Sequence, residues 1–221
     1  MKTVTERFLT YVKHHTTSDE ASDTFPSTKR QLAFAAFLAK ECEAIGLQSV
    51  SVDAYGYVTA LLPGNTANAP TIGFISHMDT SPDASGENVL SNIVENYDGK
   101  AIPLNGTVLS PKEFPSLKEY IGQTLITSDG TTLLGADDKA GIAEYGEIMQ
   151  NKIDRLQDLV YEEVGYQFNL NSPKQLGEAL FIKLGLPAGK KTKTGYSTNA
   201  EVLEKLRYEH PVVELILEYR T

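Results

Sequence analysis

The sequence predicts an α/β layer in the first part of the chain and an all-helical segment in the rest. One helical pattern followed by three strand-like stretches, between residues 28 and 76, is typical of an α/β layer. Apolar residues then keep helical spacing from Ile142 to Val164, with no glycine or proline between Glu147 and Val164. Beyond residue 172 the sequence carries a series of helix-capping signals.

Composition places the protein among ordinary globular proteins. Its 221 residues are 41% hydrophobic and 22% charged, enough to form one domain or two small ones. The net charge of −9 argues against general attraction to nucleic acid or anionic membranes. Cys42 is the single cysteine, which excludes an internal disulfide, and no apolar run approaches membrane-spanning length. Because Met1–His15 also lacks the apolar core of a signal peptide, we expect a cytoplasmic protein.

Local signals predict the elements of the α/β part. Residues 4–12 have the pattern of a short amphipathic helix. Thr28 and Gln31 form a capping-box pattern for a second helix, which ends near Gly46. Residues 49–62 read as a hairpin that turns near Tyr55-Gly56.

Residues 71–83, TIGFISHMDTSPD, predict a buried strand that ends in a chemical site. Side chains alternate along a strand, so His77 and Asp79 are expected on the same side. A carboxylate there can fix the tautomer of the imidazole and leave one ring nitrogen for a metal. The alternative is a hydrogen-bonded structural histidine.

Asp137 and Asp138 form a second candidate site. Residues 123–134 predict a hairpin turned at Ser128-Asp129-Gly130, which delivers Asp137 to the same end as His77. The stretch that precedes this hairpin, residues 84–118, is predicted to be loop-rich. Two adjacent carboxylates repel each other unless a cation such as a divalent metal lies beside them. The alternative is a helix N-terminus, where the helix dipole favours acidic residues.

The first part of the sequence resembles the peptidase T family of dinuclear zinc aminopeptidases. The stretches that carry this resemblance are PSTKRQ, FISHMDTSPD, IVENYDGK, VLSPKEFPSL and GQTLITSDGTTLLGADDKAGIAE, within about residues 1–144. The resemblance implies a metallopeptidase, a hydrolase that releases the N-terminal residue from tripeptides, with short peptides as substrates. It implies that His77 binds one zinc and that Asp79 is the catalytic acid beside it. Asp137 would bridge two zinc ions, with Asp138 following across a strained peptide bond.

Residues 145–221 resemble bacterial family-A DNA polymerase I, in the helical region that leads into the thumb and precedes the palm. FNLNSPKQLGEALFIKLGLPAGKKTKTGYSTNAEVLEKL and VELILEYR carry this resemblance. From the residues alone, three helices are expected to begin near Ser172-Pro173, at Thr198 with Glu201, and at Pro211.

The lysines of this second part are a further candidate for DNA contact. Lys190, Lys191 and Lys193 could touch phosphates, although a solvated loop without aromatic platforms accounts for them too. The segment carries ten basic and eleven acidic residues, so its net charge is only −1. We assign no nucleic-acid-binding residue.

The two resemblances together predict a chimera with an incomplete zinc-peptidase site. The peptidase family also uses a Glu-Glu pair, another acidic ligand and a second histidine, and the sequence departs from the family before reaching them. Glu162-Glu163 is interpreted as coincidence, because an unbroken helix would place it about 37 Å from Asp137. His77 and Asp137 would then hold at most one zinc ion, weakly, whereas catalytic zinc normally has three protein ligands.

Three functions follow from this prediction. The first is a zinc tripeptide aminopeptidase by ancestry. The second, which we favour for activity, is a non-catalytic chimera or fragment. The third is a polymerase-derived helical segment with weak DNA contact, which lacks the palm carboxylates that polymerase chemistry needs.

Overall fold

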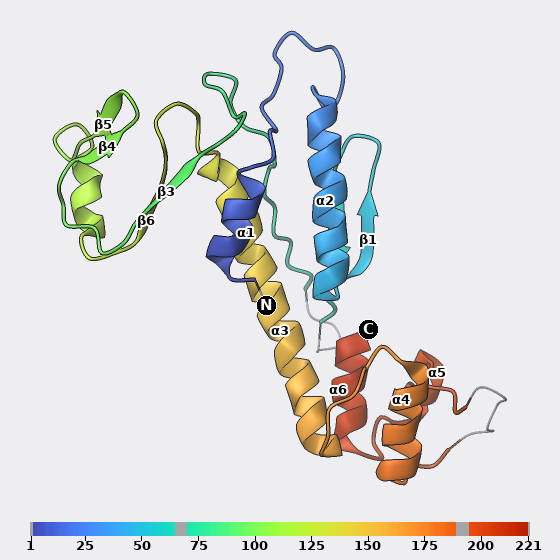
Figure 1. The fold of residues 1–221 in the computed structure, drawn as a ribbon. Coiled ribbons are helices and arrows are strands. Elements are labelled where there is room, and N and C mark those ends of the chain that lie inside the picture. Colours follow the sequence, from blue (N-terminus) through green and yellow to red (C-terminus); the bar gives the residue numbers. More distant parts are fainter. Residues whose placement is uncertain (1, 65–69, 189–194, 221) are drawn as a thin grey trace. The chain divides into compact units, whose positions relative to one another are not determined.

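The computed structural model describes residues 2–64, 70–188 and 195–220, and the chain forms two compact units (Figure 1). The first unit consists of Met1–Cys42, Val50–Thr59 and Phe74–Glu147. The second consists of Glu43–Ser49, Ala60–Gly73 and Ile148–Thr221. The first contains short sheets with helices and the second is mainly helical, as the predicted fold class requires. The boundary between residues 144 and 145 stays a prediction.

Helices form the core of the first unit. Helix α1 (Val4–Tyr11) and helix α2 (Lys29–Ile45) pack with the first half of helix α3 (Ala136–Val164), which is the long yellow helix of Figure 1. The Thr3–Glu6 capping box starts α1, and the Val4 amide donates to Glu147 of α3 at 3.1 Å. The buried core residues are Phe8, Tyr11, Val12, Phe34, Leu38, Val89 and Ala143.

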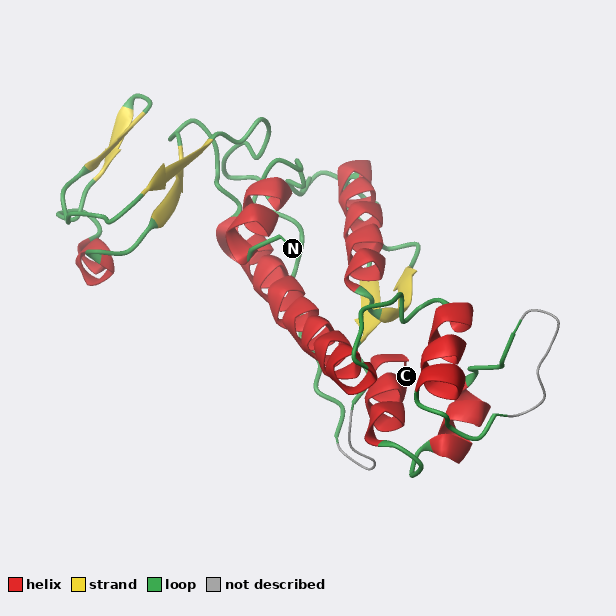
Figure 2. Cartoon of the chain, turned by 60° about the horizontal axis from the view of Figure 1, so that its bottom comes forward, coloured by secondary structure: helices red, strands yellow, loops and turns green. Residues whose placement is uncertain are grey.

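Short strands form three two-stranded sheets in the described part of the chain (Figure 2). The strands are β1 (Gln48–Val52), β2 (Val58–Leu61), β3 (Ser91–Val94), β4 (Ile102–Leu104), β5 (Thr107–Leu109) and β6 (Leu125–Ser128), with a 3-10 helix, η1, at Pro115–Tyr120. β1 pairs with β2, which confirms the hairpin predicted over residues 49–62. β3 and β6 are antiparallel, as are β4 and β5.

The strand predicted within residues 71–83 is wrong. The structure assigns no strand to this stretch; within it, Thr80 alone forms an isolated parallel bridge, with Thr17. Ile72 and Ile75 are 74% and 89% exposed. Of the three apolar side chains, Phe74 does make a contact: the centres of the Phe74 and Tyr145 rings are 5.0 Å apart. An apolar run is buried only where other strands and helices cover it, and those long-range contacts are not encoded in its periodicity.

The hairpin predicted over residues 123–134 is also wrong. Its first half forms β6, but β6 pairs with β3, in a region that the sequence predicts as loop. Asp129 accepts hydrogen bonds from both the amide and the hydroxyl of Thr131, which makes a local turn after β6. The chain is then no longer paired with β3, and the Leu133 amide donates to the Ser85 carbonyl at 2.9 Å. The turn was recognisable from the sequence, and the partner strand was not.

The long helix predicted from Ile142 to Val164 is confirmed by α3. It begins at Ala136, two residues before the expected Asp138, and Asp137 and Asp138 have non-helical backbone angles. The peptide bond between these two residues is cis.

The second unit has its own helical core. After α3 it contains α4 (Pro173–Gly177), the π-helical stretch η2 (Glu178–Lys183), α5 (Ala200–Leu206) and α6 (Pro211–Arg220). The largest fully buried side chains of this unit are Leu170, Leu176, Leu180, Leu203, Ile216, Val160, Val164 and Val212. None of the helices in the described ranges is both long and apolar enough to cross a membrane.

Helix capping follows the sequence closely, with two corrections. Ser172 caps α4 by accepting from the Gln175 amide, as predicted. Asn199, not Thr198, caps α5, because the Thr198 carbonyl and hydroxyl instead accept from Arg220. At α2 half of the predicted capping box forms: Gln31 accepts from the Thr28 amide at 3.2 Å, but the buried Thr28 hydroxyl finds no partner among the described residues.

Candidate functional site

His77 lies between two carboxylates in the first unit. Its Nε2 atom is 3.0 Å from Oδ1 of Asp137, and its Nδ1 atom is 3.2 Å from Oδ1 of Asp79. The Nδ1 atom is also 3.0 Å from the backbone carbonyl oxygen of Asp79. The structure therefore brings together the three residues that the sequence singled out, although the backbone around His77 is not the predicted strand.

The site is open to solvent. The side chains of His77, Asp79 and Asp137 are 54%, 48% and 95% exposed. Partial burial lowers the pKa of His77, but the hydrogen bond with Asp137 and the backbone and charge of Asp79 outweigh it, so the pKa lies above its ordinary value. The carboxylates thus favour a positive charge at this position.

The donor atoms suit one zinc ion only in part. An imidazole nitrogen and a carboxylate oxygen are both zinc ligands, and Nε2 of His77 faces Oδ1 of Asp137. In the described ranges 2–64, 70–188 and 195–220, no group of three or more His, Cys, Asp or Glu side chains could hold a metal ion. His77 and Asp137 therefore fit the role of two donors, with further positions left to water.

The side chain of Asp138, at the start of helix α3, packs closely against Gly141 of the same helix. A Cβ atom added to Gly141 would collide with Oδ1 of Asp138 and would lie 2.9 Å from the hydroxyl oxygen of Ser76. Ser76 immediately precedes His77, so glycine at position 141 lets the two site segments approach each other. The sequence contained this glycine within ADDKAG, but only the close approach shows why a side chain does not fit there.

Lys139 follows the acidic pair and is almost completely buried. Its ammonium donates to the carbonyl oxygen of His14 at 2.7 Å and lies 5.5 Å from the centre of the Phe34 ring. Burial lowers the pKa of Lys139 to about 8. Lys139 therefore connects the start of α3 to the segment that follows α1.

Ser18 contacts the site and Gln31 contacts Ser18, and the sequence did not single either of them out for this role. The Ser18 hydroxyl donates to Oδ2 of Asp79 at 2.7 Å, and Gln31 donates to the Ser18 oxygen at 3.2 Å. Gln31 is the last residue of the PSTKRQ stretch that carries the resemblance, and its own sequence pattern predicted only a role in capping helix α2. Ser18 carried no signal of its own.

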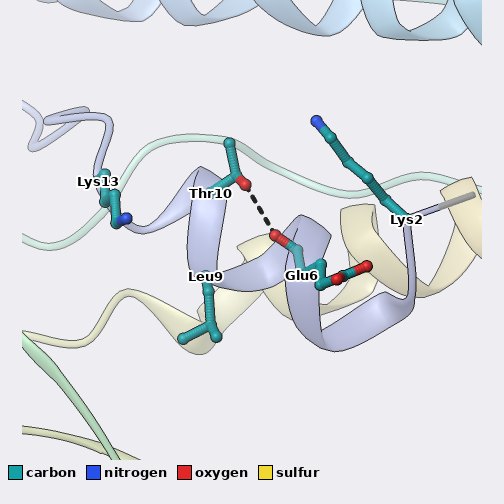
Figure 3. Close-up of a pocket in the computed structure, with 5 residues that line it drawn as sticks. All are labelled: Lys2, Glu6, Leu9, Thr10 and Lys13. Atoms are coloured by element: carbon teal, nitrogen blue, oxygen red, sulfur yellow. Dashed lines mark hydrogen bonds between the residues drawn. The ribbon is translucent and has the colours of Figure 1, made fainter.

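The other candidates lie elsewhere. Glu162 and Glu163 are exposed on the part of α3 that belongs to the second unit. Lys190, Lys191 and Lys193 lie outside the described residues. A shallow hollow on α1, lined by Lys2, Glu6, Leu9, Thr10 and Lys13, shares no residue with the His77 site (Figure 3).

Comparison with known proteins finds two kinds of similarity, one in the N-terminal part of the chain and one in the C-terminal part. Residues 139–221 match the family model of DNA polymerase family A. The N-terminal part is similar to peptidase T proteins. Peptidase T of Caldanaerobacter subterraneus subsp. tengcongensis is 66% identical over 148 residues, which cover 65% of this chain and 36% of that protein.

Two further relatives show the same pattern. Peptidase T of Halothermothrix orenii is 61% identical over 148 residues, again 65% of this chain and 36% of that protein. Peptidase T of Clostridium novyi is 54% identical over 158 residues, which cover 70% of this chain and 39% of that protein. The chain thus spans little more than a third of the length of these relatives. It joins a peptidase T-like part to a polymerase-like part, the pattern of a chimera.

Proposed function

We propose that the peptidase T-like part keeps a remnant of a zinc aminopeptidase site, and that the 221-residue chain binds at most one zinc ion weakly and does not hydrolyse tripeptides. The observation that carries this proposal is the arrangement of His77 between Asp79 and Asp137. High identity to peptidase T proteins supports the origin of the site, and the two-donor geometry supports the loss of turnover.

Each site residue has a defined role in this proposal. His77 Nε2 and Asp137 Oδ1 would hold the ion, and Asp79 would orient the imidazole through Nδ1. Zinc, when bound, supplies a Lewis acid that polarises a peptide carbonyl. Hydrolysis also needs a base that takes a proton from water, and Asp79 is committed to His77 and Ser18.

Zinc titration and peptide hydrolysis in the same preparation test the proposal. We expect at most one weak binding event in calorimetry, loss of that event in His77→Ala, and no release of the N-terminal residue from a tripeptide. His15→Ala is the matched control, because His15 lies outside the site, and it should bind zinc like the unmodified chain. Tight binding of two zinc ions per chain, with turnover that His77→Ala abolishes, would contradict the proposal.

The match to DNA polymerase family A raises DNA binding as a second function. We infer that this chain binds DNA only weakly. Three cations of the second unit are already engaged: Lys205 and Arg207 pair with Glu201 and Glu204, and Arg220 donates to backbone carbonyls. The net charge of residues 145–221 is −1, so this segment has no excess of positive charge to attract phosphates.

Fluorescence anisotropy with a labelled primer–template, at moderate salt and with the full chain, tests this inference. We expect a Kd no tighter than about 1 µM, the range of non-specific binding. The triple variant Lys190→Ala, Lys191→Ala, Lys193→Ala is the comparison. Sub-micromolar binding that weakens with added salt and is lost in this variant would show that the lysine run is a DNA contact.

A further inference from the structure

Asp79 is held from two sides. Its Oδ1 atom faces Nδ1 of His77 at 3.2 Å, and its Oδ2 atom accepts a hydrogen bond from the Ser18 hydroxyl at 2.7 Å. A carboxylate engaged through both oxygens cannot rotate without breaking one of these contacts. Ser18 therefore restrains the orientation of the group that faces the imidazole.

The backbone holds Ser18 in this position. The Ser18 amide donates to the Thr80 carbonyl at 3.0 Å, and the Thr80 amide donates to the Thr16 carbonyl at 3.3 Å. These bonds form the parallel bridge between Thr17 and Thr80. The same bridge fixes the chain next to the Asp79 carbonyl, which is the second acceptor for Nδ1 of His77.

Gln31 determines the residue to which the Ser18 hydroxyl donates its hydrogen. A backbone amide can only donate, so the Thr28 amide requires the Oε1 atom of Gln31 on its side. The Nε2 atom of Gln31 then faces Ser18 and Thr16, and donates to the Ser18 hydroxyl oxygen at 3.2 Å and to the Thr16 carbonyl at 3.3 Å. Because Ser18 accepts from Gln31, its one hydrogen is directed to Asp79.

The hydrogen bond from Ser18 to Asp79 matters for His77, because the carboxylates of Asp79 and Asp137 favour a proton on different nitrogens of the neutral ring. Asp137 is 3.0 Å from Nε2 and would favour a proton on that nitrogen. Both acceptors of Asp79 favour a proton on Nδ1 instead. A neutral imidazole can bind a metal through Nε2 only when Nδ1 carries the proton.

We propose that Ser18 and Gln31 are positioning residues that orient Asp79, so that the neutral His77 ring carries its proton on Nδ1 and leaves Nε2 for a metal ion. Gln31 is 4% exposed and Asp79 is half-exposed. The hydrogen bonds therefore run from the buried first turn of helix α2 to the solvent-exposed site. This inference rests on the proposed zinc site, and it names residues that prepare His77 for the ion.

Long-range nitrogen–proton NMR spectra of the metal-free full chain test the inference directly, at a pH where His77 is neutral. We expect the Nδ1-protonated tautomer to dominate, and the ratio of the two tautomers to fall about three- to tenfold in Ser18→Ala, the equivalent of one net hydrogen bond. Ser18→Thr keeps the hydroxyl and should restore the ratio. Gln31→Glu should lower it as well, because a carboxylate at position 31 accepts the Ser18 hydrogen and diverts it from Asp79.

Ser22→Ala is the matched control. It removes a hydroxyl from the same loop, where Ser22 contacts Thr24 and not Asp79, so the tautomer ratio should stay unchanged. An unchanged ratio in a folded Ser18→Ala variant would overturn the inference. If Ser18→Ala does not fold, Ser18→Cys replaces it, because a thiol is a poorer donor of similar size.

Zinc calorimetry on the same variants separates the two proposals. An orienting partner of a zinc-binding histidine typically contributes 10- to 100-fold to affinity, so Ser18→Ala should bind zinc at least about tenfold more weakly than the unmodified chain. A chain that binds no zinc but shows the expected tautomer change would show that the remnant site does not hold the ion, and it would leave the positioning role standing. Zinc binding that is equal in Ser18→Ala and the unmodified chain would refute the positioning role alone.

Discussion

Arg7→Ala is expected to destabilise the first unit by about 3–5 kcal/mol, the usual cost of removing one partner from a buried ion pair. Arg7 is 2% exposed, and its Nη1 atom is 2.8 Å from Oε1 of Glu41, whose side chain is 11% exposed. Removal of Arg7 leaves the Glu41 carboxylate buried without this cation. Tyr11 lies in the same environment: burial, followed by the hydrogen bond with Glu41, raises the pKa of Tyr11 above its usual range.

Urea unfolding followed by circular dichroism, together with hydrogen exchange of the α1 and α2 amides, measures the effect. Lys2→Ala is the matched control, because Lys2 approaches the same Glu41 oxygen at 3.4 Å from a half-exposed position. A surface pair of this kind contributes at most about 1 kcal/mol. The double variant Arg7→Met, Glu41→Leu should recover most of the lost stability. Equal losses in Arg7→Ala and Lys2→Ala would show that burial of the Arg7–Glu41 pair does not determine its contribution.

Leu176→Ala is expected to destabilise the second unit by about 2–5 kcal/mol, because it leaves a cavity in a closely packed core. Leu176 is fully buried on α4, in a cluster that also contains Val160 of α3, Leu203 of α5 and Ile216 of α6. Its side chain therefore supports packing among four helices. Urea unfolding and the exchange rates of the α6 amides measure this loss.

Ile182→Ala tests whether the effect comes from burial. Ile182 lies in η2, shortly after α4 in the chain, but its side chain is 65% exposed. Its replacement should change stability by no more than about 0.5 kcal/mol. A loss at Ile182 as large as that at Leu176 would contradict the assignment of the core.

Elements with local determinants were predictable from the sequence. The spacing from Ile142 to Val164 defined the long helix α3, and Ser172 with Pro173 defined the start of α4, because helical hydrogen bonds and caps join residues only a few positions apart. The β1–β2 hairpin is local in the same sense. The residue types of the candidate site were also visible in SHMD and GADDKAG.

The tertiary structure alone decided which distant segments meet. β6 pairs with β3 across a long loop, and the apolar residues Ile72 and Ile75 stay exposed because the described chain places no strand beside them. His77 and Asp137 are 60 residues apart in sequence and 3.0 Å apart in space, and the contacts of Ser18 and Gln31 with the site depend on the same folding. Periodicity and capping describe interactions within a few residues, whereas pairing, burial and site geometry depend on contacts that only the folded chain supplies.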